Sequence, residues 1–175
     1  VSDSAVQAMN DFLVIMGVSG CGKSSLAAAV AAAEGLPLVE GDAHHSEASR
    51  EKMRQGIALT DADRAGWLER LADQLLAHPQ GCVLTCSALR RAYRERLRTA
   101  VPALRFAFLE IAPAEAQARV AARSAHFFSP SLVDNQFATL EPPIGEPRVL
   151  RLDATAPLIQ LQAEVSTWLH SKEAA

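Results

Sequence analysis

Short apolar runs, each about the length of a strand, recur along the chain with longer mixed segments between them. Residues 12–16 read Phe-Leu-Val-Ile-Met, and residues 82–86 are apolar at every position except Thr85. A continuously apolar run of this length is typical of a strand that is covered on both faces in a parallel sheet. The pattern predicts five strands, at residues 12–16, 36–40, 82–86, 104–109 and 149–152.

The segments between these runs carry apolar residues at the three- and four-residue spacing of a helix with one buried face. In one of them, Thr60 and Asp63 resemble a capping box at the start of a helix. Residues 46–58 are strongly charged, so a helix there would bury little. Helices are expected over residues 23–33, 46–58, 60–76, 87–98, 113–123, 129–140 and 158–169.

Strands that alternate with helices predict an α/β fold of three layers. In this fold, helices cover both faces of a mostly parallel, five-stranded sheet. The chain has 175 residues and is 49% hydrophobic, which suffices for one buried core and predicts a single domain over residues 1–175. Residues 1–10 lack the basic start and apolar middle of a signal peptide, and we expect them to form a flexible N-terminus.

The net charge and the cysteine positions indicate which binding partners and which cellular compartment to expect. With a net charge of −3 and a pI near 6.0, the chain lacks the basic character that favours binding to nucleic acid or an anionic membrane. Its apolar runs are far shorter than a bilayer requires. Cys82 and Cys86 would lie about 13 Å apart on one strand, which is too far for a disulfide. We therefore expect reduced thiols, a cytoplasmic location and small-molecule partners, with no nucleic acid and no membrane.

A phosphate-binding motif follows the first predicted strand. Residues 17–24, Gly-Val-Ser-Gly-Cys-Gly-Lys-Ser, fit the pattern G-x-x-x-x-G-K-[ST] between a strand and a helix. The glycines let backbone N–H groups approach phosphate oxygens, Lys23 can reach the outer phosphates, and the Ser24 hydroxyl can coordinate Mg²⁺. The simpler alternative is a glycine-rich turn into an ordinary helix. The predicted ATP-binding residues are Gly17, Val18, Ser19, Gly20, Cys21, Gly22, Lys23, Ser24 and Ser25.

Two absences from the sequence narrow the class of phosphate-loop protein. No N-K-x-D segment occurs, which disfavours a GTPase switch, and the strand at 82–86 leads into Ser87 rather than into the Walker-B aspartate of a motor ATPase. The carboxylate near Mg²⁺ must then come from elsewhere, and Glu40 with Asp42, at the end of the second predicted strand, is the nearest candidate pair. Asp42 is the candidate base that accepts the proton of an alcohol substrate in a kinase. The alternative for Asp42 is a cap on the following helix.

Arginines that could stabilise a transferring phosphoryl group lie near the end of the helix predicted at 113–123. Arg119 and Arg123 are four residues apart on one helical face, next to residues 124–140, which we interpret as a lid. Guanidinium groups that enter an ATP site on a closing lid would stabilise transition-state charge and help to exclude water. Two surface arginines are the simpler alternative.

The helix predicted at 87–98 carries another stripe of arginines, at Arg90, Arg94 and Arg98. Only Arg90, which is nearest the strand end, is expected to reach a ligand. Much of the remaining helix is expected to face solvent, because a run of charges on a helix is most often a solvated face.

Six motifs follow one another along the chain: Met16-Gly17-Val18-Ser19-Gly20-Cys21-Gly22-Lys23-Ser24; Gly41-Asp42-Ala43-His44-His45; Glu51-Lys52-Met53; residues 59–64 with Trp67-Leu68; Cys86-Ser87-Ala88-Leu89-Arg90-Arg91 with Tyr93-Arg94; and His126-Phe127-Phe128 with residues 136–142. In this order they resemble the gluconate kinases, in the group of P-loop small-molecule kinases that also holds shikimate and adenylate kinases. The resemblance implies a nucleoside-monophosphate-kinase-like fold with a helical lid. It also implies phosphorylation of D-gluconate to 6-phospho-D-gluconate with ATP and Mg²⁺, by a cytoplasmic homodimer.

The resemblance also assigns regions and residues. It implies that residues 42–64 bind the acceptor and that residues 124–140 are the lid. A polyhydroxy carboxylate needs hydrogen-bonding and cationic neighbours, which residues 42–64 supply. The predicted acceptor-binding residues are Asp42, His45, Lys52, Arg64, Arg90 and His126; the predicted catalytic residues are Lys23, Asp42, Arg119 and Arg123; and the predicted Mg²⁺ ligands are Ser24 and, through water, Glu40.

Two other functions stay open on the sequence alone. A P-loop kinase could act on another small hydroxy acid, such as shikimate or a different aldonate. A protein of another class, a non-catalytic ATP sensor, could bind nucleotide without turnover. ADP production that depends on an acceptor would separate these possibilities.

Overall fold

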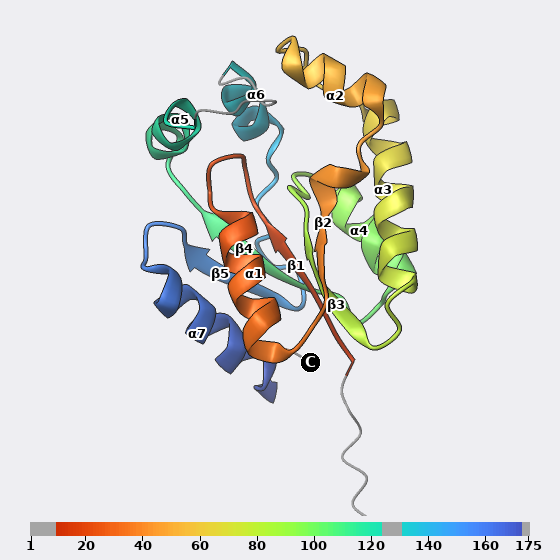
Figure 1. The fold of residues 1–175 in the computed structure, drawn as a ribbon, viewed down its shortest axis with the longest axis vertical. Helices are drawn as coiled ribbons and strands as arrows, with labels where there is room; N and C mark the ends of the chain where they lie inside the picture. Colours follow the sequence, from red (N-terminus) through yellow and green to blue (C-terminus); the bar gives the residue numbers. More distant parts are fainter. Residues whose placement is uncertain (1–9, 124–130, 173–175) are drawn as a thin grey trace, which may run out of the picture.

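A parallel sheet lies at the centre of the molecule. In the computed structural model, which describes residues 10–123 and 131–172, the strands run in the order β2-β3-β1-β4-β5 (Figure 1). The predicted α/β fold with five strands is confirmed, and the neighbouring strands are all parallel, where the prediction was a mostly parallel sheet. Residues 124–130 of the predicted lid and residues 1–9 of the expected flexible N-terminus lie outside the described residues. The strands are β1 (Asp11–Met16), β2 (Leu38–Glu40), β3 (Gly81–Thr85), β4 (Arg105–Glu110) and β5 (Val149–Asp153).

Two helices begin with the residues that the sequence predicts for a helix N-terminus. The Thr60 hydroxyl accepts a hydrogen bond from the Asp63 N–H, and the Asp63 carboxylate accepts one from the Thr60 N–H, so the predicted capping box is present. Pro113 stands in the first turn of its helix, as predicted. None of the helices within the described ranges has the length and apolar character needed to cross a membrane. The helices are α1 (Lys23–Glu34), the 3₁₀ helix η1 (Gly41–His44), α2 (Glu47–Arg54), α3 (Asp61–Leu76), α4 (Arg91–Ala100), α5 (Pro113–Ala121), α6 (Ser131–Thr139) and α7 (Leu158–Leu169).

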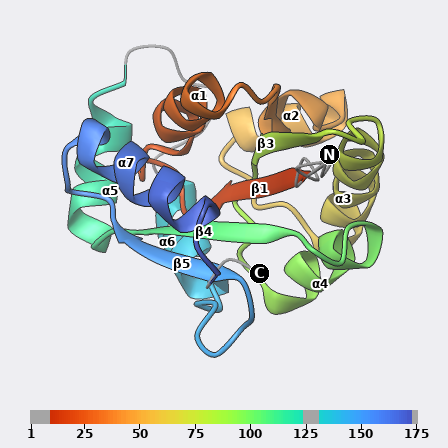
Figure 2. The ribbon, with the colours of Figure 1, turned by 90° about the horizontal axis from the view of Figure 1, so that it is seen from below.

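Strand β1 shows why the sequence pattern is continuously apolar. Leu13 and Ile15 pack in a core shared with α1 and α7, whereas Val14 and Met16 pack in a second core shared with α3 and α4. Figure 2 shows these helices around the sheet. Successive side chains of a strand point to opposite faces, so a strand covered on both sides needs an apolar residue at every position. The sheet is therefore the middle layer of three, as predicted.

The clearest difference in element boundaries lies after β3. Helix α4 begins at Arg91, whereas the sequence pattern predicts a start at residue 87. Ala88 has a φ of 48°, in the left-handed region that an α-helix cannot contain. Residues 86–90 therefore form a loop, and Ser87 is free to face the cavity at the end of the sheet.

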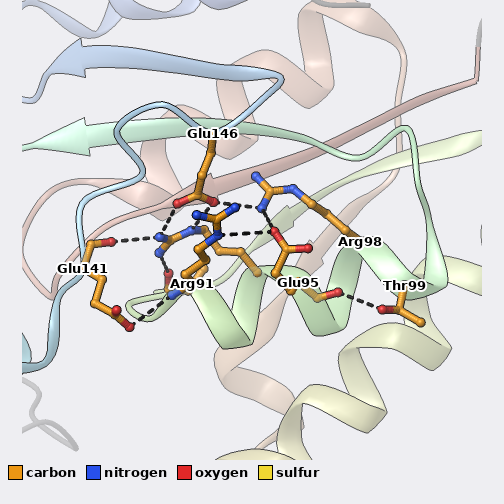
Figure 3. Close-up of polar contacts among 8 residues, drawn as sticks. Arg91, Glu95, Arg98, Thr99, Glu141 and Glu146 are labelled. Carbon is orange, nitrogen blue, oxygen red and sulfur yellow. Dashed lines mark hydrogen bonds and ion pairs between the residues drawn. The ribbon is translucent and has the colours of Figure 1, made fainter.

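The second difference from the sequence-based expectation concerns the arginines of α4. Much of this helix was expected to face solvent, but Arg94 is fully buried and donates two hydrogen bonds, of 2.9 and 2.6 Å, to the Glu146 carboxylate. Arg98 is only 8% exposed and donates to the same carboxylate at 2.8 Å (Figure 3). Glu146 lies 52 positions beyond Arg94, on the loop between α6 and β5, so helical periodicity could not reveal this partner.

All the strands end at one edge of the sheet because they are parallel. At this edge β1 leads into the phosphate loop, defined here as residues 17–24, while β2 leads into η1 and β3 leads into loop 86–90. Open α/β sheets bind ligands outside the carboxyl ends of their strands. The fold thus brings the three predicted chemical segments together.

Candidate active site

The phosphate loop has the form of an anion-binding cradle. Helix α1 begins at Lys23, so its N-terminal N–H groups and the positive end of its dipole lie at the loop. Gly20 has a φ of 86°, and a Cβ atom there would lie 2.8 Å from the carbonyl oxygen of Ala116. The loop therefore requires glycine at this position. The Lys23 ammonium donates to the carbonyl oxygens of Gly17 and Val18, each at 3.0 Å, and so lies folded over the loop.

A cavity of about 120 Å³ opens beside the phosphate loop. It is lined by residues from the phosphate loop, η1, α3, loop 86–90 and α6, and by the segment that ends α5. The candidate base, Asp42, and the candidate phosphate-binding lysine, Lys23, therefore face one space. The predicted site residues that line it are Ser19, Lys23, Asp42, His45, Arg64 and Arg123.

Asp42 is placed where a substrate can reach it. Its side chain is 65% exposed, and its Oδ1 lies 3.6 Å from Nε2 of His45. The protein atoms around the cleft partly desolvate the Asp42 carboxyl although it stays open to the cavity. This desolvation acts to raise its pKa, but the contact with His45 and the charges of Lys23 and Arg123 outweigh it. The net effect lowers the pKa below its ordinary value, so the group is ionised at neutral pH and able to accept a proton.

The ring of His45 is fixed by its neighbours. It stacks on Trp67 with ring centroids 4.3 Å apart and an angle of 19° between the planes. The Trp67 indole N–H in turn donates to the carbonyl oxygen of Gly41 at 2.8 Å. Within the described residues, Nδ1 of His45 is buried without a hydrogen-bond partner. Stacking thus holds the imidazole beside Asp42 and leaves one ring nitrogen unsatisfied.

A group of oxygen atoms beside the phosphate loop suits a divalent cation. Oε2 of Glu40 accepts hydrogen bonds from the Ser24 hydroxyl at 3.1 Å and from the Thr85 hydroxyl at 2.7 Å. A hydroxyl and a carboxylate are the hard oxygen ligands that Mg²⁺ prefers. The structure therefore brings together Ser24 and Glu40, the two residues that the sequence suggested for the metal.

Arg64 lines the cavity, and its guanidinium is held by two neighbouring residues. Its Nη1 donates to the carbonyl oxygen of Leu59 at 2.9 Å and to the Tyr93 hydroxyl at 3.4 Å. The Tyr93 hydroxyl donates to Asp61 at 2.5 Å, which lowers the pKa of the Asp61 carboxyl. Arg90 is not among the residues that line the cavity, and its guanidinium lies 3.9 Å from Asp61. The predicted contact of Arg90 with the acceptor therefore stays a prediction.

The comparison with known proteins identifies the family. A family model described as an AAA domain matches residues 12–143. The gluconokinase of Gluconobacter oxydans is 44% identical over 144 residues, which cover 81% of this chain and 81% of that protein. The thermosensitive gluconokinase of Escherichia coli is 37% identical, over 80% of this chain and 77% of that one. The chain belongs to the gluconokinase family. It is therefore an enzyme of the kinase class with a P-loop nucleotide-binding fold, as the sequence motifs predict.

Solved structures agree with this assignment. A gluconokinase from Sinorhizobium meliloti superposes with a TM-score of 0.84 at 42% identity and covers 91% of each chain. An APS kinase from Mycobacterium tuberculosis has a TM-score of 0.64 at 22% identity, which shows a shared fold only. The fold of this chain is thus shared by that APS kinase as well as by the gluconokinase.

Gln136 is a cavity residue whose role the sequence motifs of the gluconokinase family did not reveal. Its side-chain oxygen accepts a hydrogen bond of 2.7 Å from the backbone N–H of Ser19, and it also lines the cavity. The bond joins α6 to the phosphate loop across 117 positions of sequence. Gln136 belongs to the sixth sequence motif, but the motif assigned it no role, because its hydrogen bond to the phosphate loop depends on tertiary structure.

Of the remaining predicted catalytic and acceptor-binding residues, Lys52 and Arg119 are not among those that line the cavity, and His126 lies outside the described residues. Lys52 pairs with Asp63 at 2.8 Å. Arg119 donates to the carbonyl oxygens of Gly20 at 3.4 Å and Ala154 at 3.2 Å, and so lies against the phosphate loop. His126 falls in residues 124–130 and lies outside the described residues. The predicted roles of these three residues stay predictions.

Proposed function

We propose that this enzyme phosphorylates D-gluconate to 6-phospho-D-gluconate with ATP. The observation that carries the proposal is that Lys23 and Asp42 line one cavity at the carboxyl edge of the sheet. A phosphate-binding lysine and an ionised carboxylate in one space suit the transfer of a phosphoryl group to an alcohol. The gluconokinase names of the relatives support gluconate as that alcohol.

In the proposed reaction, a hydroxyl oxygen of gluconate forms a bond to the γ-phosphorus of ATP while the bond from that phosphorus to ADP breaks. Asp42 accepts the hydroxyl proton. Lys23 stabilises the negative charge on the transferring group, and Arg123, which also lines the cavity, adds a second cation. Arg119 is assigned a supporting charge at the phosphate loop, where it contacts Gly20.

Recognition of the acceptor is assigned to residues 42–64. Arg64 presents a cation to the cavity and can pair with the carboxylate of a sugar acid, and His45 can donate or accept a hydrogen bond with its hydroxyls. Lys52, Arg90 and His126 are proposed as further acceptor contacts. The first two of these cations are paired with Asp63 and Asp61, so either would have to exchange partners to bind gluconate.

We propose Mg²⁺ as the cofactor that accompanies ATP. Ser24 and Glu40 would hold it, since their oxygens lie together beside the phosphate loop. When bound, Mg²⁺ neutralises charge on the phosphate oxygens of the nucleotide. Across residues 10–123 and 131–172, no group of three or more His, Cys, Asp or Glu side chains could hold a metal. That finding suits a cation that is bound partly by the nucleotide.

The proposal also covers the lid, the oligomeric state and the cellular location. We propose that residues 124–140 act as a lid, which the hydrogen bond from Ser19 to Gln136 supports because it ties α6 to the nucleotide site. We also propose a homodimer in the cytoplasm, on the strength of the resemblance stated above and of the three free, buried cysteines, which suit a reducing compartment.

An assay of ADP release tests the proposal. ADP production by the purified enzyme with ATP and Mg²⁺ would be measured with gluconate, other sugar acids, shikimate and nucleoside monophosphates as acceptors. We expect gluconate to give the highest kcat/KM. If another acid gave the highest kcat/KM, that acid would replace gluconate as the proposed substrate, and the kinase assignment would stand. ATP binding without acceptor-dependent turnover would contradict the kinase proposal and favour an ATP sensor.

A further inference from the structure

Thr85 lies at the point where the predicted cation site meets the sheet. It is the last residue of β3 and is only 4% exposed. Its register partner on the neighbouring parallel strand is Glu40, the last residue of β2. The strand pairing therefore sets the Thr85 side chain beside the carboxylate that was assigned to the cation.

The hydrogen bonds around Thr85 have a fixed direction. The Gly41 N–H can only donate, and it donates to the Thr85 hydroxyl oxygen at 3.0 Å. The single hydroxyl proton of Thr85 is then available to Glu40, whose Oε2 lies 2.7 Å away. The Ser24 hydroxyl donates to the same carboxylate oxygen at 3.1 Å, which leaves its lone pairs available to a cation.

The backbone enforces this arrangement. A Cβ atom at Gly41 would lie 2.0 Å from the carbonyl oxygen of Thr85, so the ends of β2 and β3 approach as closely as glycine permits. This approach brings the Gly41 N–H and the Glu40 carboxylate within reach of one hydroxyl. Because Thr85 is buried, little water is available to replace it.

We propose that Thr85 is a positioning residue for the divalent cation, whose hydroxyl holds the Glu40 carboxylate beside Ser24. The inference rests on the nucleotide and metal part of the proposed function. It also accounts for the missing Walker-B aspartate. In this chain β3 ends in the hydroxyl of Thr85 instead of a carboxylate, and that hydroxyl orients the Glu40 carboxylate of the neighbouring strand β2.

The test compares Thr85→Val, which keeps the shape and removes the hydroxyl, with Thr85→Ser, which keeps the hydroxyl. The probe is Mn²⁺ in the presence of ADP, and free Mn²⁺ is measured by electron paramagnetic resonance. Residues that orient metal ligands typically change affinity by about 10- to 100-fold. We therefore expect Thr85→Val to weaken Mn²⁺ binding to the enzyme–ADP complex by at least about tenfold, and Thr85→Ser to stay within about threefold of the wild type.

A second measurement is ADP binding in the presence of a chelator, followed by calorimetry. It separates a loss of metal positioning from a general distortion of the nucleotide site. The metal-free affinity for ADP should be unchanged in Thr85→Val. Equal loss of metal-free and Mn²⁺-dependent binding would indicate a purely structural role and overturn the inference, as would wild-type Mn²⁺ binding. If the valine variant does not fold, Thr85→Ala removes the same hydroxyl with a smaller side chain and is judged by the same two measurements.

A double variant adds a check that is independent of gluconate. In a Glu40→Gln background, Thr85→Val should weaken Mn²⁺ binding little further, because the two residues act through one carboxylate. Additive losses would contradict the inference. Since no acceptor is present, a failure here is distinct from a failure of the wild-type enzyme to phosphorylate gluconate.

Discussion

At the scale of single residues, the proposed mechanism depends on the charge of Asp42, which has to be ionised to accept the proton of an alcohol. The carboxyl is pulled in two directions: burial acts to raise its pKa, and the His45 ring with the Lys23 and Arg123 charges lowers it. The net effect is a lower pKa for the Asp42 carboxyl. A carboxyl with a depressed pKa stays ionised as the pH falls, so activity that depends on it should be lost only at low pH.

The contact between His45 and Asp42 can be tested by a change in the pH profile. We expect His45→Phe, which can keep the stacking on Trp67 but lacks Nε2, to move the acid limb of kcat/KM for gluconate to higher pH. The reason is that the substitution removes one of the influences that lower the pKa of Asp42. His44→Phe, at the neighbouring position, is the matched control and should leave the limb in place. An unchanged limb in His45→Phe would contradict this account of the Asp42 charge.

Residue types could be predicted from the sequence wherever a motif fixes spacing along the chain. Lys23 and Ser24 follow the loop after β1, and Glu40 and Asp42 lie at the end of β2 and just beyond it. The structure places Lys23 and Asp42 in one cavity. Thr85 could not be singled out, because a threonine in an apolar strand is ordinary. Its role depends on the register between two strands that are distant in sequence.

At the scale of elements, α4 is held by a buried ion pair that joins it to the loop between α6 and β5. Arg94 also donates to the carbonyl oxygens of Ala88 at 2.7 Å and Glu141 at 2.9 Å, so one guanidinium binds two loops and a carboxylate. The Glu141 carboxylate accepts from the Arg91 N–H at 3.3 Å, at the first turn of α4 (Figure 3). The loop that follows α6 is therefore attached firmly to the body of the enzyme.

Breaking this buried pair should destabilise the fold strongly. Arg94→Met leaves the Glu146 carboxylate in a buried position, where its side chain is 3% exposed, without its main partner. We expect the free energy of unfolding to fall by about 3–5 kcal/mol, as is usual when one partner of a buried pair is removed. Urea denaturation followed by circular dichroism measures the change.

An exposed pair on the same helix supplies the control. Arg96 and Glu69 form a bidentate pair of 2.6 and 2.7 Å, but their side chains are 36% and 58% exposed. We expect Arg96→Met to cost under about 1 kcal/mol. Equal losses in the two variants would mean that burial does not set the strength of the Arg94 pair.

Element types along the chain followed from apolar periodicity, and the boundaries depended on local backbone geometry. The start of α4 was missed because the left-handed Ala88 has no signal in composition. The burial of Arg94 and Arg98 was missed because an arginine stripe on a helix is usually solvated, and only the tertiary structure supplies Glu146.

At the scale of the whole molecule, the fold was predictable because strands and helices alternate and the phosphate loop follows the first strand. The parallel sheet then gathers all strand ends at one edge, which explains why residues scattered from Ser19 to Gln136 meet in one cavity. The depth of the cavity and the contact of α6 with the phosphate loop depend on three-dimensional packing, which no spacing along the chain encodes.

The most direct test of the central claim is the gluconate-dependent turnover of Asp42→Asn, measured beside its affinity for ATP. The substitution keeps the shape of the side chain and removes its ability to accept the hydroxyl proton. We expect kcat to fall well over about tenfold, since general-base contributions are typically about 10²- to 10⁴-fold, while the Kd for ATP stays near that of the wild type. Full turnover by Asp42→Asn would contradict the proposed mechanism and remove Asp42 from the reaction.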